Sequence, residues 1–392
     1  MKITQLHELV NQTTQEVLGE TAVLQDDLSN VVDIGKQIID SENVDAYVKK
    51  LVNHIGKVIF VNRLYSGGVP SVMMDSWEYG SILEKVTADM PTATENKSWD
   101  LNDGEDYSPN VFYKPSVSAK FFNSMVTFEI PMSFTELQVK QSFSNANQLN
   151  GFISMLVTSI ENAMTVKLDA LIMRTINNMA AETLHAELDA DGDGAGEIDY
   201  TGSTVKAVNL LKLFNDSRDA EQATTKETAL LNPDFIRFAA YQIGLYTDRM
   251  SKISTLFNVG GKERFTPKDM LHTILLADFA KASVTFLGQD VYNAEHMALP
   301  QHETVPYWQG SGVGYEFSEI SKLDVKTASG QTVSTDGILG VMFDRDALGV
   351  TNLDRRVTTN YNPKAEFYNN FYKFDAGYYN DLNENFVVFF MG

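Results

Sequence analysis

The sequence predicts an α+β fold, and three observations support this prediction. Residues 149–179 repeat apolar side chains at the i, i+3, i+4 and i+7 spacing of one long amphipathic helix. Two apolar runs, Gly337–Phe343 and Phe386–Met391, have the length and composition of strands, and the second is apolar enough to be covered on both faces. Residues 63–132 are broken by Gly and Pro, and they contain alternating segments that are typical of strands.

The first 62 residues are predicted to be mainly helical. Leu6, Leu9 and Val10 recur at helical spacing, and a second helical pattern runs from about Asp45 to Ile59. Because this segment is too short to make a core of its own, we expect it to be an arm that docks elsewhere.

Residues 63–132 are expected to form a long polar two-stranded excursion. Candidate strands lie at Ile82–Val86, Val111–Phe112 and Ser124–Ile130, and the Asn102–Gly104 triplet signals a turn. Isolated hairpins are marginally stable in water, so this one needs a neighbouring molecule to rest on.

The strongest helical signal covers Asn147–Thr183. A helix of that length would be roughly 55 Å long at about 1.5 Å per residue. Such a length is typical of a structural spine, although a core helix of an ordinary domain would show the same apolar stripe.

The segments after the predicted helix differ in composition and in expected structure. Residues 189–202 form an acidic, Gly-rich loop, and residues 203–335 are expected to form mixed α/β structure. After the strand at Gly337–Phe343 we expect a turn and a long polar–aromatic loop before the final strand. Within 203–335 the predicted elements are a helix at Leu210–Phe214, a buried strand at Thr228–Leu231, a helix capped by Asn232 with Pro233 in its first turn, and a strand at Leu271–Leu276.

Composition excludes several classes of protein. The chain has 392 residues and a formal net charge of -21, from 52 acids and 31 bases. Without a run of Lys or Arg, this balance argues against tight binding to nucleic acid or to an anionic membrane. The absence of cysteine excludes disulfides and thiolate metal sites. The chain shows no signal peptide and no run near the ~20 apolar residues of a membrane span, so we expect a soluble protein made in the cytoplasm.

One segment has metal-ligand spacing. Asp189, Asp191 and Asp193, followed by Gly194, resemble the start of an EF-hand-type calcium loop. The pattern then fails, because the twelfth position is Tyr200 where a bidentate carboxylate is needed. A calcium site at these three aspartates and a solvated acidic turn are therefore both open.

Other polar groups carry less specific signals. Asp344 and Asp346 flank Arg345, and Arg355 and Arg356 follow, which predicts either an intersubunit ion-pair cluster or a polar turn. No nucleophile elbow, phosphate-binding loop or dinucleotide fingerprint is present in the sequence. We therefore expect no enzymatic activity, no catalytic residues and no cofactor apart from calcium.

Two stretches resemble a known family. The segment VNRLYSGGVPSVMMDSWEYGSILEKV (61–86) resembles the start of the extended loop in major capsid proteins of tailed phages that infect Gram-positive bacteria. The segment FYNNFYKFDAGYYNDLNENFVVFFMG (367–392) resembles their C-terminus, and the order of elements over the whole chain is similar to the Hong Kong 97 capsid fold.

The resemblance implies a division of the chain. In this division the chain would consist of an N-terminal arm (1–62), an extended β loop with flanking strands (63–132), a spine helix with the acidic loop in a peripheral domain (133–202), an axial domain (203–335) and a C-terminal return into the peripheral domain (336–392).

The resemblance also implies a function. Copies of the chain would assemble in the host cytoplasm into hexamers and pentamers of an icosahedral virion shell. The shell would enclose double-stranded DNA without sequence-specific binding, and scaffolding, portal or decoration proteins would be further partners. The alternative from another class is an extracellular, calcium-stabilised surface or adhesion protein, which suits the acidic balance and the Asp189–Asp193 loop.

Overall fold

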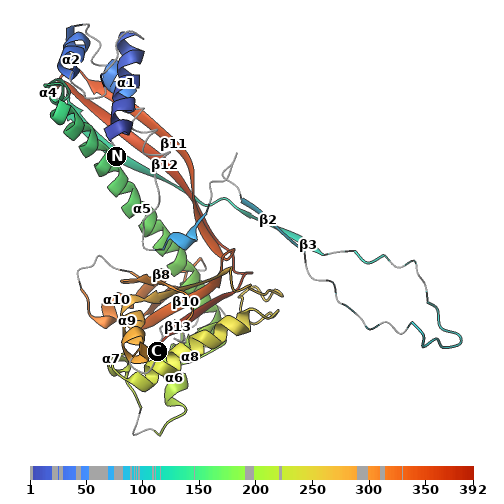
Figure 1. Cartoon of the computed structure of the whole chain (residues 1–392). Helices are drawn as coiled ribbons and strands as arrows, with labels where there is room; N and C mark the ends of the chain where they lie inside the picture. Colours follow the sequence, from blue (N-terminus) through green and yellow to red (C-terminus); the bar gives the residue numbers. More distant parts are fainter. Residues whose placement is uncertain are drawn as a thin grey trace. The chain divides into compact units, whose positions relative to one another are not determined.

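The computed structural model confirms a mixed helix and strand architecture (Figure 1). The residues that the structure describes are 3–19, 25, 30–40, 46–52, 69–74, 83–88, 91, 93, 95, 98–107, 110, 112–114, 116–144, 146–189, 198–219, 223–288, 299–309, 314–328 and 330–392.

The chain divides into two compact units. The first unit consists of Met1–Trp77, Met125–Arg174 and Val350–Gly377. The second consists of Glu78–Ser124, Thr175–Gly349 and Tyr378–Gly392. The five-part division expected from the sequence stays a prediction.

The described part of the first unit contains a four-stranded sheet in the order β1-β11-β12-β4. Strands β4 and β12 are antiparallel, from Phe367 opposite Thr135 to Gly377 opposite Met125. The bounds of the strands and of the smaller helices are β1 (Met73–Met74), β4 (Met125–Thr135), β11 (Leu348–Asn362), β12 (Phe367–Asn380), α1 (Ile3–Leu18), α2 (Val31–Asp40), α4 (Glu136–Ser142) and the 3₁₀ turn η1 (Pro70–Val72).

The predicted spine helix is present as α5, which runs from Ala146 to Leu188. Its apolar stripe is buried, including Ile153, Ile160 and Ile172. Within the first unit, the ring of Phe152 on α5 packs edge-on against Phe134 on β4, with 5.5 Å between centroids. Burial of one face along its length explains how so long a helix is stable.

The second unit is built on a sheet with the strand order β5-β13-β10-β6-β7 among its described residues. Strand β13 lies between β5, to which it is parallel, and β10, to which it is antiparallel. The prediction that the final apolar run is an internal strand is therefore confirmed. The bounds are β5 (Ala207–Asn209), β6 (Leu271–Leu276), β7 (Glu303–Val305), β10 (Ile338–Asp344) and β13 (Phe386–Phe390).

Helices cover this sheet, and buried side chains from the helices and the strands together form the core of the second unit. Phe235 on α8, Phe279 on α9 and Phe389 on β13 belong to one buried cluster. Helix α8 begins as predicted, because the Asn232 side chain accepts a hydrogen bond of 3.0 Å from the amide of Asp234. The helices are α6 (Leu210–Asn215), α7 (Lys226–Ala229), α8 (Pro233–Met250), α9 (Ala277–Gly288) and α10 (Phe317–Ile320), and two hairpins add β2 (Leu83–Ala88) with β3 (Val117–Phe122) and β8 (Leu323–Lys326) with β9 (Thr332–Thr335).

Three expectations about elements were wrong. Thr228–Leu231 is not a strand, because Thr225 opens the short helix α7 with a capping box that includes Thr228. The candidate strand at Val111–Phe112 is wrong at Phe112, which is exposed and lies outside any strand, while Val111 lies outside the described residues. Strand β2 pairs with β3.

The third error concerns the expected polar–aromatic loop before the last strand. It forms the two long strands β11 and β12. Alternate residues Tyr368, Tyr372 and Phe374 of β12 are buried, which is the period-two pattern of a strand. Polar residues between the aromatics disguised this pattern, although aromatic side chains favour strands.

Helices α1 and α2 confirm the helical N-terminal prediction for their residues, and residues 46–52 are also helical. Apart from residues 19, 25 and 30, which are described and not helical, the rest of the predicted arm lies outside the described residues. None of the helices in the described part of the chain is long and apolar enough to cross a membrane.

Candidate functional site

The site with the most unusual electrostatics lies at the base of the β2–β3 hairpin. The two strands are antiparallel, and Lys85 of β2 stands directly opposite Lys120 of β3. Like charges in directly opposed positions destabilise a strand pair. An anion must therefore compensate for this pair of lysines.

The compensating anion is Asp381, in the turn between β12 and β13. Its two carboxylate oxygens accept contacts from both lysines, at 3.0 Å from Lys85 Nζ and 2.9 Å from Lys120 Nζ. The Asp381 side chain is only 3% exposed, whereas that of Lys120 is 43% exposed. Asp381 therefore joins both strands of the hairpin to the turn that leads into β13.

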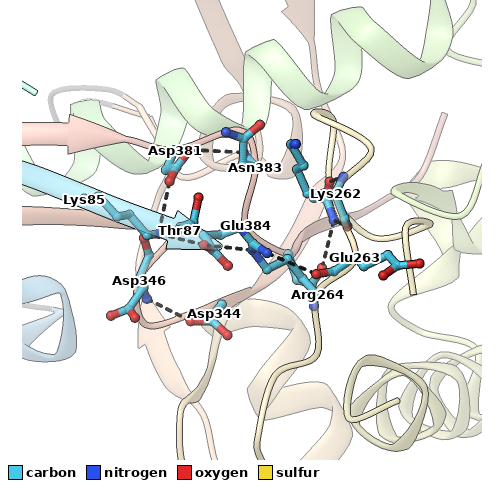
Figure 2. Close-up of polar contacts among 12 residues, drawn as sticks. Lys85, Thr87, Lys262, Glu263, Arg264, Asp344, Asp346, Asp381, Asn383 and Glu384 are labelled. Carbon is cyan, nitrogen blue, oxygen red and sulfur yellow. Dashed lines mark hydrogen bonds and ion pairs between the residues drawn. The ribbon is translucent and has the colours of Figure 1, made fainter. Parts of the chain in front are cut away.

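A second carboxylate extends the network (Figure 2). Glu384 Oε1 lies 2.7 Å from Lys85 Nζ and 3.2 Å from Arg264 Nε. Lys85 Nζ also donates to the backbone oxygen of Asp346 at 3.3 Å. The cations of Lys85 and Arg264 thus share one carboxylate, and the arrangement ties the hairpin to two other segments of the second unit.

Backbone hydrogen bonds fix the two carboxylates in position. The amide of Asp381 donates to the carbonyl of Ala347 at 2.7 Å, and the amide of Glu384 donates to the carbonyl of Asp381 at 3.1 Å. The amide of Asn383 donates to Asp381 Oδ1 at 3.1 Å. Because the turn is held on both sides, the carboxylates are already placed to receive the lysines.

The ion pairs shift the pKa values of both partners towards their charged forms. Burial alone would raise the pKa of Asp381, but hydrogen bonds from Lys120 and the charge of Lys85 outweigh burial and hold that pKa below its ordinary value. Burial alone would lower the pKa of Lys85, but Glu384 and Asp381 together raise it above its ordinary value. Both groups therefore stay charged over a wide range of pH.

Aromatic contacts supplement the ion pairs. Phe122 at the end of β3 lies with its ring centroid 5.0 Å from that of Tyr379, and both side chains are buried. Lys120 Nζ also lies 5.2 Å from the centroid of Phe122. The base of the hairpin therefore has an apolar anchor beside a charged one.

The connection between β2 and β3, residues 89–116, differs sharply from this base. Its described residues include large apolar side chains in contact with solvent, among them Trp99 at 97% and Phe112 at 85% exposure. The others are Leu101, Tyr107 and Tyr113. A soluble chain seldom exposes so much apolar surface in one segment unless that segment contacts a partner.

The predicted metal ligands are only partly within the described residues. Asp189 forms an isolated antiparallel bridge with Ile198, while Asp191 and Asp193 lie outside the described part. In the part of the chain that the structure describes, no cluster of three metal-ligating side chains is present. Calcium at Asp189, Asp191 and Asp193 stays a prediction.

The predicted charge cluster at 344–356 is divided between two local arrangements. In the second unit, Asp344 Oδ1 accepts from the amide of Asp346 at 2.9 Å, as in a polar turn. In the first unit, Arg356 Nη1 pairs with Asp375 at 2.7 Å and with Asp354 at 3.2 Å.

Sequence reasoning missed the network at the hairpin base. The partners Lys120 and Asp381 are separated by 261 positions. In the sequence, the alternating pattern around Lys85 identifies it only as a polar position of a strand. No nearby residue indicates which acidic side chain pairs with Lys85. The one usable signal was indirect, because two lysines opposite each other in a predicted hairpin require an acid from elsewhere.

Comparison with solved structures identifies the fold. The chain is similar to a solved capsid structure of Staphylococcus phage Andhra, with a TM-score of 0.51 and 9% identity over 84% of this chain and 86% of that chain. It is also similar to a structure from bacteriophage P68 described as head fiber and inner core protein gp22, with a TM-score of 0.50 and 9% identity over 85% of this chain and 86% of that chain. These likenesses establish the Hong Kong 97-type fold that the sequence resemblance implied.

The family follows from the sequence itself. The model of the family described as Phi29-like phage major capsid protein matches residues 10–390, so this chain belongs to that family. It is a structural protein of the phage shell, which is built from copies of the chain. A search of curated proteins found no match. Neither the family nor the fold supports the alternative of a surface or adhesion protein.

Proposed function

We propose that copies of this chain close an icosahedral shell of hexamers and pentamers, and that the β2–β3 hairpin of each copy is an arm that lies on a neighbouring copy. The observation that carries the proposal is the contrast within the hairpin. Its base is fixed by ion pairs from Lys85 and Lys120 to the buried side chain of Asp381, and its connection exposes Trp99, Phe112 and Tyr113.

The physical argument rests on the cost of an exposed apolar arm. Each large aromatic side chain that leaves water on contact with a partner gains roughly 25 cal/mol per Å² of apolar area. An arm fixed at its base loses less freedom on docking than a free tail does, so less of that gain is lost. Repeated weak contacts of this kind are sufficient in a closed assembly, because symmetry multiplies each of them.

The charge balance supports a shell that encloses double-stranded DNA without gripping it. A net charge of -21 repels the DNA backbone, so the DNA is retained by closure rather than by adhesion. The protein acts by assembly and performs no catalysis. The subunits are made and assembled in the host cytoplasm, and scaffolding, portal or decoration proteins are the further partners that a phage head would supply.

The test is electron microscopy of the chain expressed alone, beside a variant that lacks residues 95–108. Closed particles from the full chain, and a folded subunit that forms at least tenfold fewer particles from the deletion variant, are the expected results. Normal shells from the deletion variant would refute the role of the arm. The thermal unfolding midpoint of the isolated variant controls for a folding defect.

A further inference from the structure

The end of the arm, residues 98–107, is strongly acidic. Asp100, Asp103, Glu105 and Asp106 lie within it, all exposed, and no base is present. A turn gives the segment local order, since the amide of Asn102 donates to the Tyr107 hydroxyl at 3.0 Å and the amide of Glu105 donates to the carbonyl of Asn102 at 3.4 Å. With Trp99 and Leu101 exposed beside the acids, this arm end would fit a basic surface that also offers apolar contacts.

A surface of that kind lies in the second unit, at residues 249–268, which we term the basic loop. It contains five bases and a single acid, Glu263, although the chain as a whole is acidic. Asp248 and Asp269 flank it, and Lys268 Nζ pairs with Asp248 at 2.6 Å. The exposed apolar side chains Ile253, Leu256 and Phe265 lie on the same segment. The bases are Arg249, Lys252, Lys262, Arg264 and Lys268.

The basic loop is fixed before any partner arrives. Ser254 and Arg264 exchange two backbone hydrogen bonds, of 2.9 and 3.0 Å, which close the loop. Inside it, the buried side chain of Asn258 bonds both the amide and the carbonyl of Lys262 at 2.7 Å. Phe257 is buried in the core of the second unit. A loop held in this way loses little freedom when a partner binds.

We propose that the arm end of one copy docks on the basic loop of a second copy. The proposal rests on the function of the hairpin as an intersubunit arm, and adds the surface that receives it. The acids of the arm end face the lysines at the rim of the loop, and Trp99 and Leu101 cover exposed side chains such as Phe265. The charges direct the encounter and fix the register, while the apolar contact supplies most of the binding energy.

The basic loop of the same chain is the less suitable partner. Arg264 of the loop and Lys85 of β2 share the carboxylate of Glu384, so each basic loop lies beside the base of its own hairpin. From Lys85 the paired strands continue to Ala88 and Val117 before the connection begins. Docking within one chain would require the connection to turn back on its own strands, whereas docking on a second copy lets it continue outward.

Charge reversal in two sets of variants tests the proposal. The arm variant carries Asp100→Lys, Asp103→Lys and Asp106→Lys, and the loop variant carries Lys252→Glu, Lys262→Glu and Lys268→Glu. Each alone should form at least tenfold fewer particles than the unaltered chain, because arm end and loop then carry the same charge. An equal mixture of the two variants should form at least threefold more particles than either variant alone, because an arm can then find a loop of opposite charge on a different copy, although five copies around a pentamer cannot alternate the two variants at every contact.

The outcomes separate the alternatives. A mixture that fails while a chain with all six substitutions assembles would place the contact within one chain and overturn the proposal. Normal assembly of both the arm variant and the loop variant would also overturn the proposal. If the 95–108 deletion blocked assembly in that case, the hairpin would still be an intersubunit arm, and only its docking surface would be wrong. As a control, the substitutions Lys281→Glu, Lys322→Glu and Lys326→Glu make the same charge change elsewhere in the second unit and should leave assembly unchanged.

If a charge-reversed variant does not fold, Asp→Asn and Lys→Gln variants at the same positions should each show a smaller loss of particles. The absence of any such loss would count against the contact.

Discussion

Replacing Asp381 with Asn should loosen the base of the arm while leaving the fold intact. The substitution keeps the size of the side chain but removes the charge that compensates the opposed Lys85 and Lys120. Removing one partner of a buried ion pair typically costs about 3–5 kcal/mol. Lys120 is 43% exposed and Lys85 keeps Glu384, so we expect the low end, about 3 kcal/mol.

Hydrogen exchange of the isolated subunit measures this change locally. A loss of about 3 kcal/mol corresponds to roughly a hundredfold faster exchange of the amides paired between β2 and β3, if they exchange by opening of the hairpin. Amides of β10 and β13 should be much less affected, because they exchange through opening of the core. The matched control is Lys120→Met, which removes the more exposed partner and should change exchange by less than about tenfold. Unchanged protection of β2 and β3 in Asp381→Asn would refute the reasoning.

Three further predictions follow from the same structure. Protection of the β2–β3 amides, corrected for intrinsic exchange, should be constant from about pH 5 to 10 and should fall at both ends. The lowered pKa of Asp381 gives stability that is lost as pH falls through its folded pKa, and the raised pKa of Lys85 gives stability that is lost as pH rises through its folded pKa. Equal protection at pH 2 and pH 7 would contradict this prediction. Gly337→Ala should destabilise the subunit by more than about 2 kcal/mol in urea unfolding, because Gly337 has φ +91° and a Cβ there would lie 2.3 Å from the carbonyl oxygen of Met391. The control Gly104→Ala, at φ +89° in open space, should cost only about 1–2 kcal/mol. Equal costs for the two substitutions would show that the clash at position 337 is relieved. If Asp189, Asp191 and Asp193 bind calcium, millimolar calcium should raise the unfolding temperature of the subunit and a variant with Asn at all three positions should lose that rise, whereas an identical rise in both would exclude the site.

The sequence predicted those elements whose signal is continuous and local. The stripe of α5 repeats over many turns, the final apolar strand has no polar residue to obscure it, and Asn232 with Pro233 marks the start of α8 directly. Each of these patterns is caused by burial or capping within a few residues. Local patterns were sufficient for these elements because tertiary contacts agree with them.

The failures came from patterns that tertiary contacts decide. In β12, Asn370 is buried between aromatic neighbours in the strand, although its sequence context resembled a polar loop. Thr228 looked like a strand former, yet its side chain completes a helix cap with Thr225. The hairpin base was invisible for the same reason, since Lys85 and Lys120 meet Asp381 only because β12 and β13 bring that turn to them.

The most direct test of the arm is a photo-crosslinking amino acid at Phe112, which is 85% exposed in the connection between β2 and β3. Irradiation of assembled shells should join one copy to another, and mass spectrometry should locate the crosslinked peptide on the second copy. Dissociated subunits should give no crosslinked dimer. Crosslinks confined to single chains in intact shells would contradict the central claim that each hairpin reaches across to a neighbouring subunit.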